Sequence, residues 1–476
     1  MRGGLSSPAV TPVLGNVVMV AVVLGAAYAI SQGLTRASFT YTMGALAALT
    51  LFALVFVRTD FGLYVVVFSM LLSPEFGTSG GGLAEGRTVV VRSEDFILIV
   101  IGLAWLAKTA VNKELGLVAR TPLNRPILLY VVANVVATLL GTLLGDVRGA
   151  SGMFYVLKYI EYFVVYYMVV NNVQDRDHAR RLVIAAFLTA TIVSLIGIAQ
   201  IPSGERVSAP FEGEVGEPNT LGGYLLFMMA IAGGVALETH RLRMRAICLG
   251  LVGLMGLPFV FTLSRASYLG VVPAVLTLAW LTRQRRFMMG LVLLLLICSP
   301  IVALVLPSAV TQRILYTFEP EKGQATVRVG RVAFDPSTSA RLISFQTAIE
   351  GALRRPVLGY GVTGFGFMDA QYARVLVETG FVGLATFVAM IWALLRSTSA
   401  AFRDIRDAED RGVALGFLAG TVGLLFHAIG SNTFIIVRIM EPFWFFAGIV
   451  MLLPQLERAS LARRPSARAG ALGGAR

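Results

Sequence analysis

The chain has 476 residues, of which 56% are hydrophobic and only 14% are charged, and its mean hydropathy is +0.77. This composition excludes a water-soluble protein, because the apolar residues gather in runs of roughly 16–24, the length that a helix needs to cross about 30 Å of hydrocarbon. The net charge of +13 needs no nucleic acid to explain it, because most of the excess lies in loops at the membrane surface, where arginine attracts anionic lipid headgroups.

The apolar runs predict an all-α polytopic integral membrane protein with about 12–14 transmembrane helices. In chain order, we expect spans near residues 13–30, 38–57, 61–73, 95–111, 126–145, 154–172, 181–201, 220–238, 246–262, 267–282, 287–306, 372–395, 412–430 and 432–453. The first run has no small-residue cleavage pattern, so we interpret it as a retained helix and not as a signal peptide.

A long polar segment divides the chain. Residues 1–306 hold the first eleven expected spans, 307–371 form one large extracytoplasmic loop with short amphipathic helices, 372–456 hold the last spans, and 457–476 form a basic cytoplasmic tail. The loop is far longer than a connection between neighbouring helices needs to be, which indicates that it has a function. The tail is typical of a disordered tether at the membrane surface.

Lysine and arginine gather in residues 108–125, 175–181, 240–245, 283–286, 396–411 and 458–476. These segments fall on one side if every span crosses once, and the excess of positive charge in inner loops makes that side the cytoplasm. Both termini are then cytoplasmic. The corner at 264–267 and the long loop face outward.

Cysteine and histidine give no sign of a metal site. Cys248 and Cys298 both lie inside apolar runs, and the three histidines, His178, His240 and His427, are far apart in sequence. Neither a disulfide scaffold nor a cysteine-ligated metal is indicated, and we expect no metal and no cofactor.

Two outward-facing corners carry polar residues that can meet an anion. Arg265 is the single cation between two spans, where it can bind a ligand or simply extend to lipid headgroups, as many arginines at helix ends do. Pro218 favours a helix start beside Asn219, and the N–H groups of such a first turn can hold an anion or be capped in the ordinary way.

The long loop carries a predicted helix and a glycine-rich turn. Apolar residues at 342, 345, 349 and 353 predict a short amphipathic helix on the membrane, with Arg341 in its first turn. A cation there opposes the helix dipole, so we expect Arg341 to serve a partner outside the helix. The turn around Tyr360 precedes Asp369, and its glycines allow either close approach of a ligand or only a tight turn.

Ionisable residues inside the spans are costly in lipid, by on the order of 3 kcal/mol or more at mid-helix. Lys158 and Glu161 are three residues apart in one expected span, and Arg438 and Glu441 are three apart in another, so each pair can meet on one helix face. By the predicted topology these four residues and Glu378 lie in the outer half of the membrane. They either join helices to one another or line an outward-opening polar cavity for a charged ligand.

Four segments in order, EPNTLGGYL, SRASYLG, STSARLISFQTAIEGALRRPVLGYG and DAQYARVLVETGFVGL, resemble the bacterial O-antigen ligase and O-antigen or exopolysaccharide polymerase family. The similarity covers roughly residues 219–384 in motifs and the whole chain in its pattern of spans. It implies a GT-C-like, metal-independent glycosyltransferase of the bacterial inner membrane. The implied reaction transfers a glycan from an undecaprenyl diphosphate carrier to an acceptor hydroxyl on the outer face.

The resemblance also implies roles for individual residues. Arg265 and Arg341 match arginines that engage the donor diphosphate, a role that suits guanidinium because its fork of donors binds phosphate oxygens in pairs. Tyr372 and Glu378 align with the end of the family's loop, whereas Asp369 and Ala370 stand where ligases have a His-Asn pair. This departure favours a polymerase. Asp369 then accepts or holds the proton of the acceptor hydroxyl, unless it is only a helix N-cap.

We therefore predict a repeat-unit polymerase whose catalytic residues are Arg265, Arg341 and Asp369. The predicted substrate-binding residues are Lys158, Glu161, Asn219, Tyr360, Tyr372, Glu378, Arg438 and Glu441. The alternative within the family is a ligase that attaches the glycan to lipid A core or another acceptor, and the alternative of another class is a transporter or flippase of lipid-linked oligosaccharide. Against transport, the two halves of the chain show no clear similarity. The family adds a chain-length regulator and a flippase as partners.

Overall fold

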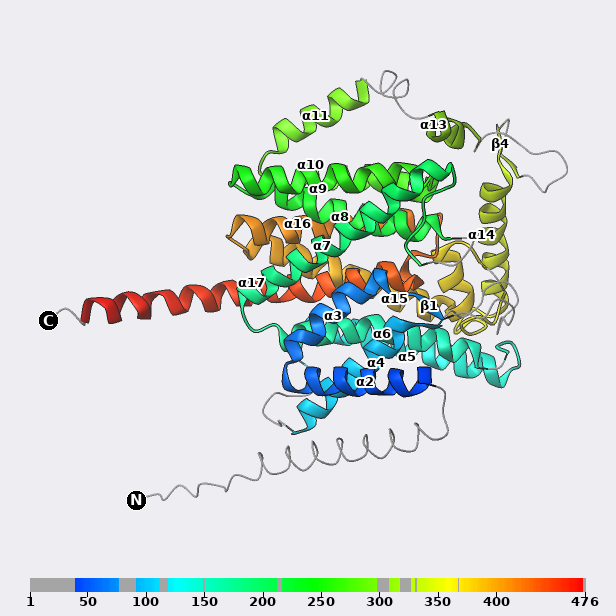
Figure 1. Cartoon of the computed structure of the whole chain (residues 1–476). Coiled ribbons are helices and arrows are strands. Elements are labelled where there is room, and N and C mark those ends of the chain that lie inside the picture. The colour runs from blue at the N-terminus through cyan, green and yellow to red at the C-terminus, as the bar shows by residue number, and fades with distance from the viewer. Residues whose placement is uncertain are drawn as a thin grey trace.

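The computed structural model describes residues 39–76, 91–111, 119–148, 150–211, 216–297, 308–316, 327–329, 332–366 and 368–473. Within these stretches the protein is a bundle of long helices whose axes run side by side, and the helix α14 lies across one end of it (Figure 1). Seven helices are long and apolar enough to cross a membrane, and three shorter apolar helices accompany them. The prediction of an all-α polytopic membrane protein is confirmed.

From residue 39 onward, each expected span coincides with a helix. These helices are α2 (Phe39–Val57), α3 (Thr59–Leu72), α4 (Ser93–Val111), α5 (Asn124–Leu143), α6 (Ser151–Asn172), α7 (Arg176–Gln200), α8 (Pro218–Glu238), α9 (Leu242–Phe261), α10 (Arg265–Leu281), α11 (Arg285–Ile297), α15 (Gln371–Asp404), α16 (Ala408–His427) and α17 (Val437–Gly473). The span expected near 13–30, the last residues of the one expected at 287–306, and Cys298 lie outside the described residues.

Within its described residues, the long loop contains two helices and a pair of short strands. They are α13 (Ser308–Leu315), the two-residue antiparallel strands β3 (Arg328–Val329) and β4 (Val332–Ala333), and α14 (Pro336–Arg354). A second two-residue pair, β1 (Glu75–Phe76) and β2 (Val91–Arg92), precedes α4, and single 3-10 turns lie at Ile201–Ser203 (η2) and Thr433–Ile435 (η4). The amphipathic helix predicted in the loop is therefore present as α14.

The bundle is packed around α8, α16, α10 and α17. Helix α16 packs against α8 and α10, and α17 packs against α6. Glycine allows the closest of these contacts: a Cβ added to Gly234 would lie 2.4 Å from the Gly412 carbonyl oxygen, and one added to Gly416 would lie 2.4 Å from the Ile231 Cα. Buried aromatic rings fill the centre, where Phe163 and Trp444 meet edge to face at 4.8 Å. Small residues thus let the backbones of α8 and α16 touch.

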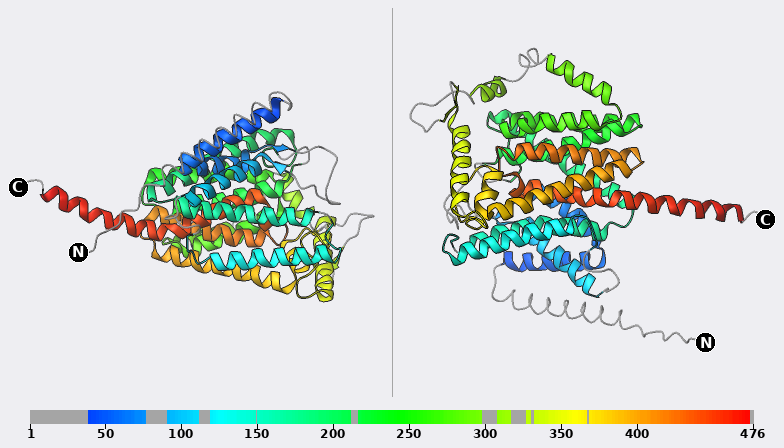
Figure 2. Two further views of the ribbon diagram at one scale, coloured as in Figure 1. Left: turned by 90° about the horizontal axis from the view of Figure 1, so that it is seen from below. Right: turned by 180° about the vertical axis from the view of Figure 1, so that it is seen from behind.

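The two ends of the bundle differ in chemistry. At the end crossed by α14, the helices α8, α10 and α17 begin at Pro218, Arg265 and Val437, and we call it the site end. At the opposite end, α9 and α11 begin at Leu242 and Arg285, and we call it the arginine end. Figure 2 shows the same arrangement from below and from behind.

The basic tail departs from the prediction of a disordered tether. Helix α17 continues through the tail to Gly473 and extends away from the bundle at the arginine end (Figure 1). The reason lies in the composition of residues 455–473, which is rich in alanine, leucine and arginine, all good helix formers.

Replacing Gly416 by valine is expected to destabilise the bundle by about 1–3 kcal/mol, because the added side chain overlaps the α8 backbone and a packed core does not absorb extra volume. The measurement is the thermal midpoint of the detergent-purified protein. Gly250→Val is the matched control, since a Cβ at Gly250 meets nothing within 4 Å. Equal midpoints for the two variants would contradict the close-packed account of α8 and α16.

Candidate functional site

The corner between α9 and α10 places Arg265 at the site end. Leu263 takes a left-handed backbone conformation with φ 49°, which is uncommon for a residue with a side chain. Ser264 then caps α10 by accepting a hydrogen bond from the Ser267 N–H, and its hydroxyl donates to the Asn219 Oδ1 at 2.7 Å. The starts of α8 and α10 are therefore tied together, and Arg265 is the first residue after the corner.

Arg206 holds this corner from the loop that follows η2. Its Nε donates to the Thr262 carbonyl at 3.0 Å, and its Nη2 donates to the Leu263 carbonyl at 3.3 Å. The guanidinium thus stabilises the end of α9 and the strained residue beside it. The sequence analysis did not identify Arg206. The only feature that could have indicated it is that it is a single cation in a loop predicted to face outward.

Arg265 is fixed by a carboxylate of the long loop. Its Nη1 and Nη2 donate to the two carboxylate oxygens of Asp335 at 2.9 and 2.8 Å, the paired geometry that guanidinium and carboxylate favour. Asp335 is fully buried, and its side chain also accepts a hydrogen bond from the Thr338 N–H as the N-cap of α14. Burial alone would raise the pKa of Asp335, but the hydrogen bonds from Arg265 and Thr338 outweigh it and lower that pKa below its usual value.

Arg341 reaches the same place from α14. Its Nη1 donates to the Ser337 hydroxyl at 3.1 Å and its Nη2 lies 3.4 Å from the Asp369 carboxylate. Its Nε is buried without a hydrogen-bond partner among the described residues. Outside its own helix, Arg341 thus contacts Asp369. The prediction that Arg341 lies in the first turn of the helix is wrong. Asp335 caps α14 and Pro336 is its first residue, so Arg341 lies in the second turn.

Asp369 is not the N-cap of the following helix. Helix α15 begins at Gln371, and its N-cap is Ala370, which makes no side-chain capping bond. The capping alternative is therefore wrong. The Asp369 side chain is 33% exposed and lies beside Arg341, so its carboxylate is open to water.

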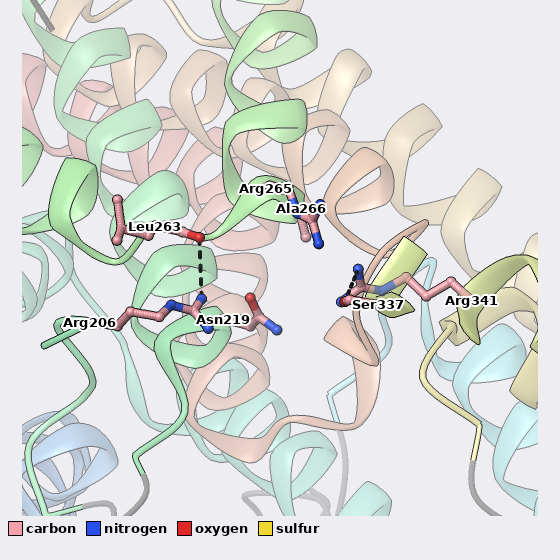
Figure 3. A pocket seen from close by; sticks show the side chains of 7 residues that line it. All are labelled: Arg206, Asn219, Leu263, Arg265, Ala266, Ser337 and Arg341. Carbon is pink, nitrogen blue, oxygen red and sulfur yellow. Dashed lines mark hydrogen bonds between the residues drawn. The ribbon is translucent and has the colours of Figure 1, made fainter. Parts of the chain in front are cut away.

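These residues enclose a small cavity of about 70 Å³ at the site end (Figure 3). It is lined by Arg206, Asn219, Leu263, Arg265, Ala266, Ser337 and Arg341. Three guanidinium groups from separate parts of the chain converge here, together with the amide of Asn219. Of the predicted site residues, the structure brings Arg265, Arg341 and Asn219 into one cavity, with Asp369 beside Arg341. Such a set of donors can hold an anion, above all a phosphate.

The end of the long loop is a scaffold for this cavity. Gly380, with φ 64°, kinks α15, and the freed carbonyls of Val377 and Glu378 accept hydrogen bonds from the N–H groups of Tyr360 and Gly361 at 3.1 and 2.7 Å. The glycine-rich turn and the Glu-x-Gly motif are therefore partners in one backbone contact.

The side chains of this scaffold are also engaged in internal contacts. Glu378 accepts hydrogen bonds from the Arg374 Nε and the Thr363 N–H, and the Tyr372 hydroxyl donates to the Leu425 carbonyl at 2.6 Å. The Tyr360 ring packs against Phe365. The residues that line the described cavity do not include Tyr360, Tyr372 or Glu378.

The predicted ionisable pairs form a separate polar cluster. Lys158 pairs with Glu161 at 3.2 Å, as predicted, and also with Asp95. Arg438 and Glu441 do not pair: Arg438 donates to the carbonyls of Ser73 and Pro210, and both Glu441 carboxylate oxygens are buried without a hydrogen-bond partner among the described residues. The prediction of an Arg438–Glu441 pair is wrong because backbone carbonyls of two loops compete for the guanidinium. None of these residues lines the cation cavity of Figure 3.

Part of the chain is similar to a known protein family. Residues 250–388, from α9 into α15, match the family model described as O-antigen ligase. The matched segment contains Arg265, Asp335, Arg341 and Asp369, whereas Arg206 and Asn219 precede it. A comparison with curated proteins gives no match.

Replacing Asp335 by asparagine is expected to cost about 1.5–3 kcal/mol of stability at neutral pH, the range for a hydrogen bond to a charged group. Because the folded-state pKa of Asp335 is lowered, its contribution is complete above the unfolded pKa of about 3.9 and is lost as the pH falls through the lower folded value. The difference in thermal midpoint between wild type and Asp335→Asn should stay constant from about pH 5 to pH 8 and shrink below about pH 4.

Asp404→Asn is the control for this prediction. Asp404 pairs with Arg458 at 3.3 Å, but both side chains are exposed, and such pairs contribute little. A loss of stability as large as that of Asp335→Asn, or a difference that vanishes by pH 6, would refute the assigned role of Asp335.

Proposed function

We propose, on the premise that residues 250–388 make this chain a member of the O-antigen ligase family, that it polymerises lipid-linked oligosaccharide repeat units. The chain is a multi-pass membrane protein of a family that processes glycans. Its donor in our proposal is an undecaprenyl-diphosphate-linked glycan, and its acceptor is a second carrier-linked glycan. The observation that carries the proposal is the convergence of Arg206, Arg265 and Arg341 on one cavity at the site end.

The proposed reaction is a displacement at the anomeric carbon of the donor sugar. The acceptor hydroxyl oxygen forms the new bond to that carbon, the bond to the carrier diphosphate breaks, and the bonding electrons leave with the diphosphate. Arg265 and Arg341 donate hydrogen bonds to the diphosphate oxygens and neutralise the charge that develops there. The proton of the acceptor hydroxyl passes to the Asp369 carboxylate, which lies beside Arg341 and is partly exposed.

The proposal differs in part from the residue assignment made from the sequence alone. Arg206 joins Asn219 as a group that lines the donor site, and Asp335 positions Arg265. Tyr360, Tyr372 and Glu378 support the loop that carries Asp369. Lys158, Glu161, Arg438 and Glu441 stay proposed contributors to substrate binding, from a separate cluster.

A ligase is the second candidate, and the description of the matching family model favours it. The sequence favours polymerisation, since Asp369 and Ala370 stand where ligases carry a His-Asn pair. In either case we propose that the reaction takes place on the outer face of the bacterial inner membrane with both termini in the cytoplasm, served by a flippase and, for a polymerase, a chain-length regulator.

The surface polysaccharide of a strain that lacks this chain distinguishes the candidates. A polymerase predicts single repeat units left on the lipid carrier, and a ligase predicts full-length polymer that stays unattached. Carrier-linked material trapped on the cytoplasmic side would instead indicate a flippase and refute both enzyme proposals.

Arg265→Ala and Arg341→Ala are each expected to lower polymer formation by at least about a hundredfold, the scale of losing one group that stabilises a developing anion. Arg341→Ala should still be present in the membrane at the wild-type level, whereas Arg265→Ala also leaves the buried Asp335 carboxylate without its cation, so polymer from that variant is compared with wild type at equal protein level. Arg354→Ala is the matched control, because Arg354 is an exposed arginine in the last turn of α14. Normal chain lengths from Arg265→Ala or Arg341→Ala would remove that arginine from the site.

Asp369→Asn is expected to reduce polymer severely, because asparagine keeps the size of the side chain but cannot take a proton from the acceptor. The measurement is the length distribution of the polysaccharide at equal protein level. Polymer close to that of wild type would show that Asp369 only orients Arg341.

A further inference from the structure

A second, much larger cavity lies between α8, α9, α10 and the start of α11. Its volume is about 480 Å³, within the range of sites for small molecules. Met229, Leu278 and Phe287 are among its lining residues, and Arg245 and Gln284 are the only polar ones. We call this cavity the apolar groove.

The polar end of the apolar groove lies at the arginine end of the bundle. Arg245 is in the first turn of α9, where its Nε and Nη2 donate to the Ala236 and Thr239 carbonyls at 3.1 and 2.8 Å and fix the guanidinium at the mouth. Gln284 lies just before α11 begins at Arg285. Arg243, Arg285 and Arg286 are exposed around it. In the part of the chain that the structure describes, no carboxylate lies within ion-pair distance of these three arginines or of Arg245, although Arg241 and Arg283 nearby have glutamate partners.

The start of α9 adds to the positive potential at this mouth. Its N-cap, Arg241, makes no side-chain capping bond, and its first turn contains no acidic residue. A helix N-terminus carries about half a positive charge and is normally complemented by an acid. Here two arginines stand in the first turns instead, which favours an anion from outside the chain.

We propose that the apolar groove binds an anionic phospholipid, with an acyl chain between α8, α9 and α10 and the headgroup phosphate at Arg245 and the exposed arginines. Apolar lining takes the chain, and a basic mouth between membrane helices selects a negatively charged headgroup over a zwitterionic one. The proposal does not depend on the glycan chemistry.

The headgroup at the groove mouth is distinct from the one in the cation cavity. Helix α10 runs from Arg265 to Leu281, 17 residues, and at 1.5 Å per residue its two ends are about 25 Å apart. One headgroup therefore cannot contact both Arg265 and the groove mouth. A donor lipid bound at the site end would leave the groove mouth for another lipid.

Binding of phosphatidylglycerol and of phosphatidylcholine to the purified full-length protein, compared by native mass spectrometry from mixed micelles, tests the proposal. We expect phosphatidylglycerol to be retained in preference. Gly233→Leu should abolish this retention, because Gly233 lines the groove and a Cβ there makes only an ordinary contact, 3.4 Å from a Leu278 methyl group. Gly253→Leu is the matched control, since Gly253 is exposed on α9 and meets nothing within 4 Å.

The headgroup contribution is tested by Arg285→Gln and Arg286→Gln. Each is expected to lower the preference for phosphatidylglycerol about fivefold, the effect of one basic residue at a lipid surface, while the binding of phosphatidylcholine is unchanged. Equal retention of the two lipids by wild type, displacement of both by a polyprenyl phosphate, or full retention by Gly233→Leu would overturn the proposal.

Discussion

The paired hydrogen bonds between Arg265 and Asp335 join parts of the chain that are 70 residues apart. Asp335 is fully buried, and a buried carboxylate without a cation costs several kcal/mol. Docking of the long loop at the site end is therefore favoured where Arg265 receives Asp335, and it brings Arg341, six residues further on, to the same place. This ion pair thus couples the docking of the loop to the formation of the cation cavity. The same pair occupies two of the Arg265 donors, so the arginine is oriented before any ligand arrives.

Most of the fold could be predicted from the sequence, because a helix that crosses a lipid bilayer must be about 20 residues long and predominantly apolar. Each expected span from residue 39 onward coincides with a helix, since an apolar run of sufficient length has no other stable structure in hydrocarbon. The candidate site could be predicted from the sequence only in part. Arg265 and Asn219 stood out as a cation and an amide at the ends of apolar runs, and Arg341 as a cation at the start of the amphipathic helix predicted in the long loop. Asp335 did not, although Asp-Pro-Ser-Thr is a cap sequence with proline at the first helical position, because its contact with Arg265 depends on how the loop docks.

The wrong prediction for Arg438 shows where local spacing fails. Residues three apart on a helix can meet, but the Arg438 guanidinium instead binds the carbonyls of Ser73 and Pro210. Loop carbonyls at the end of a bundle have no helical partner, so they compete strongly for a cation. The contact between Arg438 and Pro210 also bears on the candidate site. Pro210 belongs to the same loop as Arg206, which holds the corner before Arg265. The buried ionisable cluster and the cation cavity are therefore joined through the segment 202–211 although they share no lining residue.

The positive electrostatic potential in the cation cavity comes from the backbone as well as from side chains. Helices α8 and α10 both begin beside it, and neither has an acidic residue in its first turn. Each start contributes about half a positive charge, which adds to Arg206, Arg265 and Arg341 and exceeds the charge of Asp335, Asp369 and the α8 N-cap Glu217 together. These groups lie at the edge of a low-dielectric bundle, where electrostatic interactions are stronger than in water. A cationic substrate is disfavoured by this field. A diphosphate, with several oxygens in fixed geometry, is the ligand chemistry for which convergent guanidinium groups are best suited.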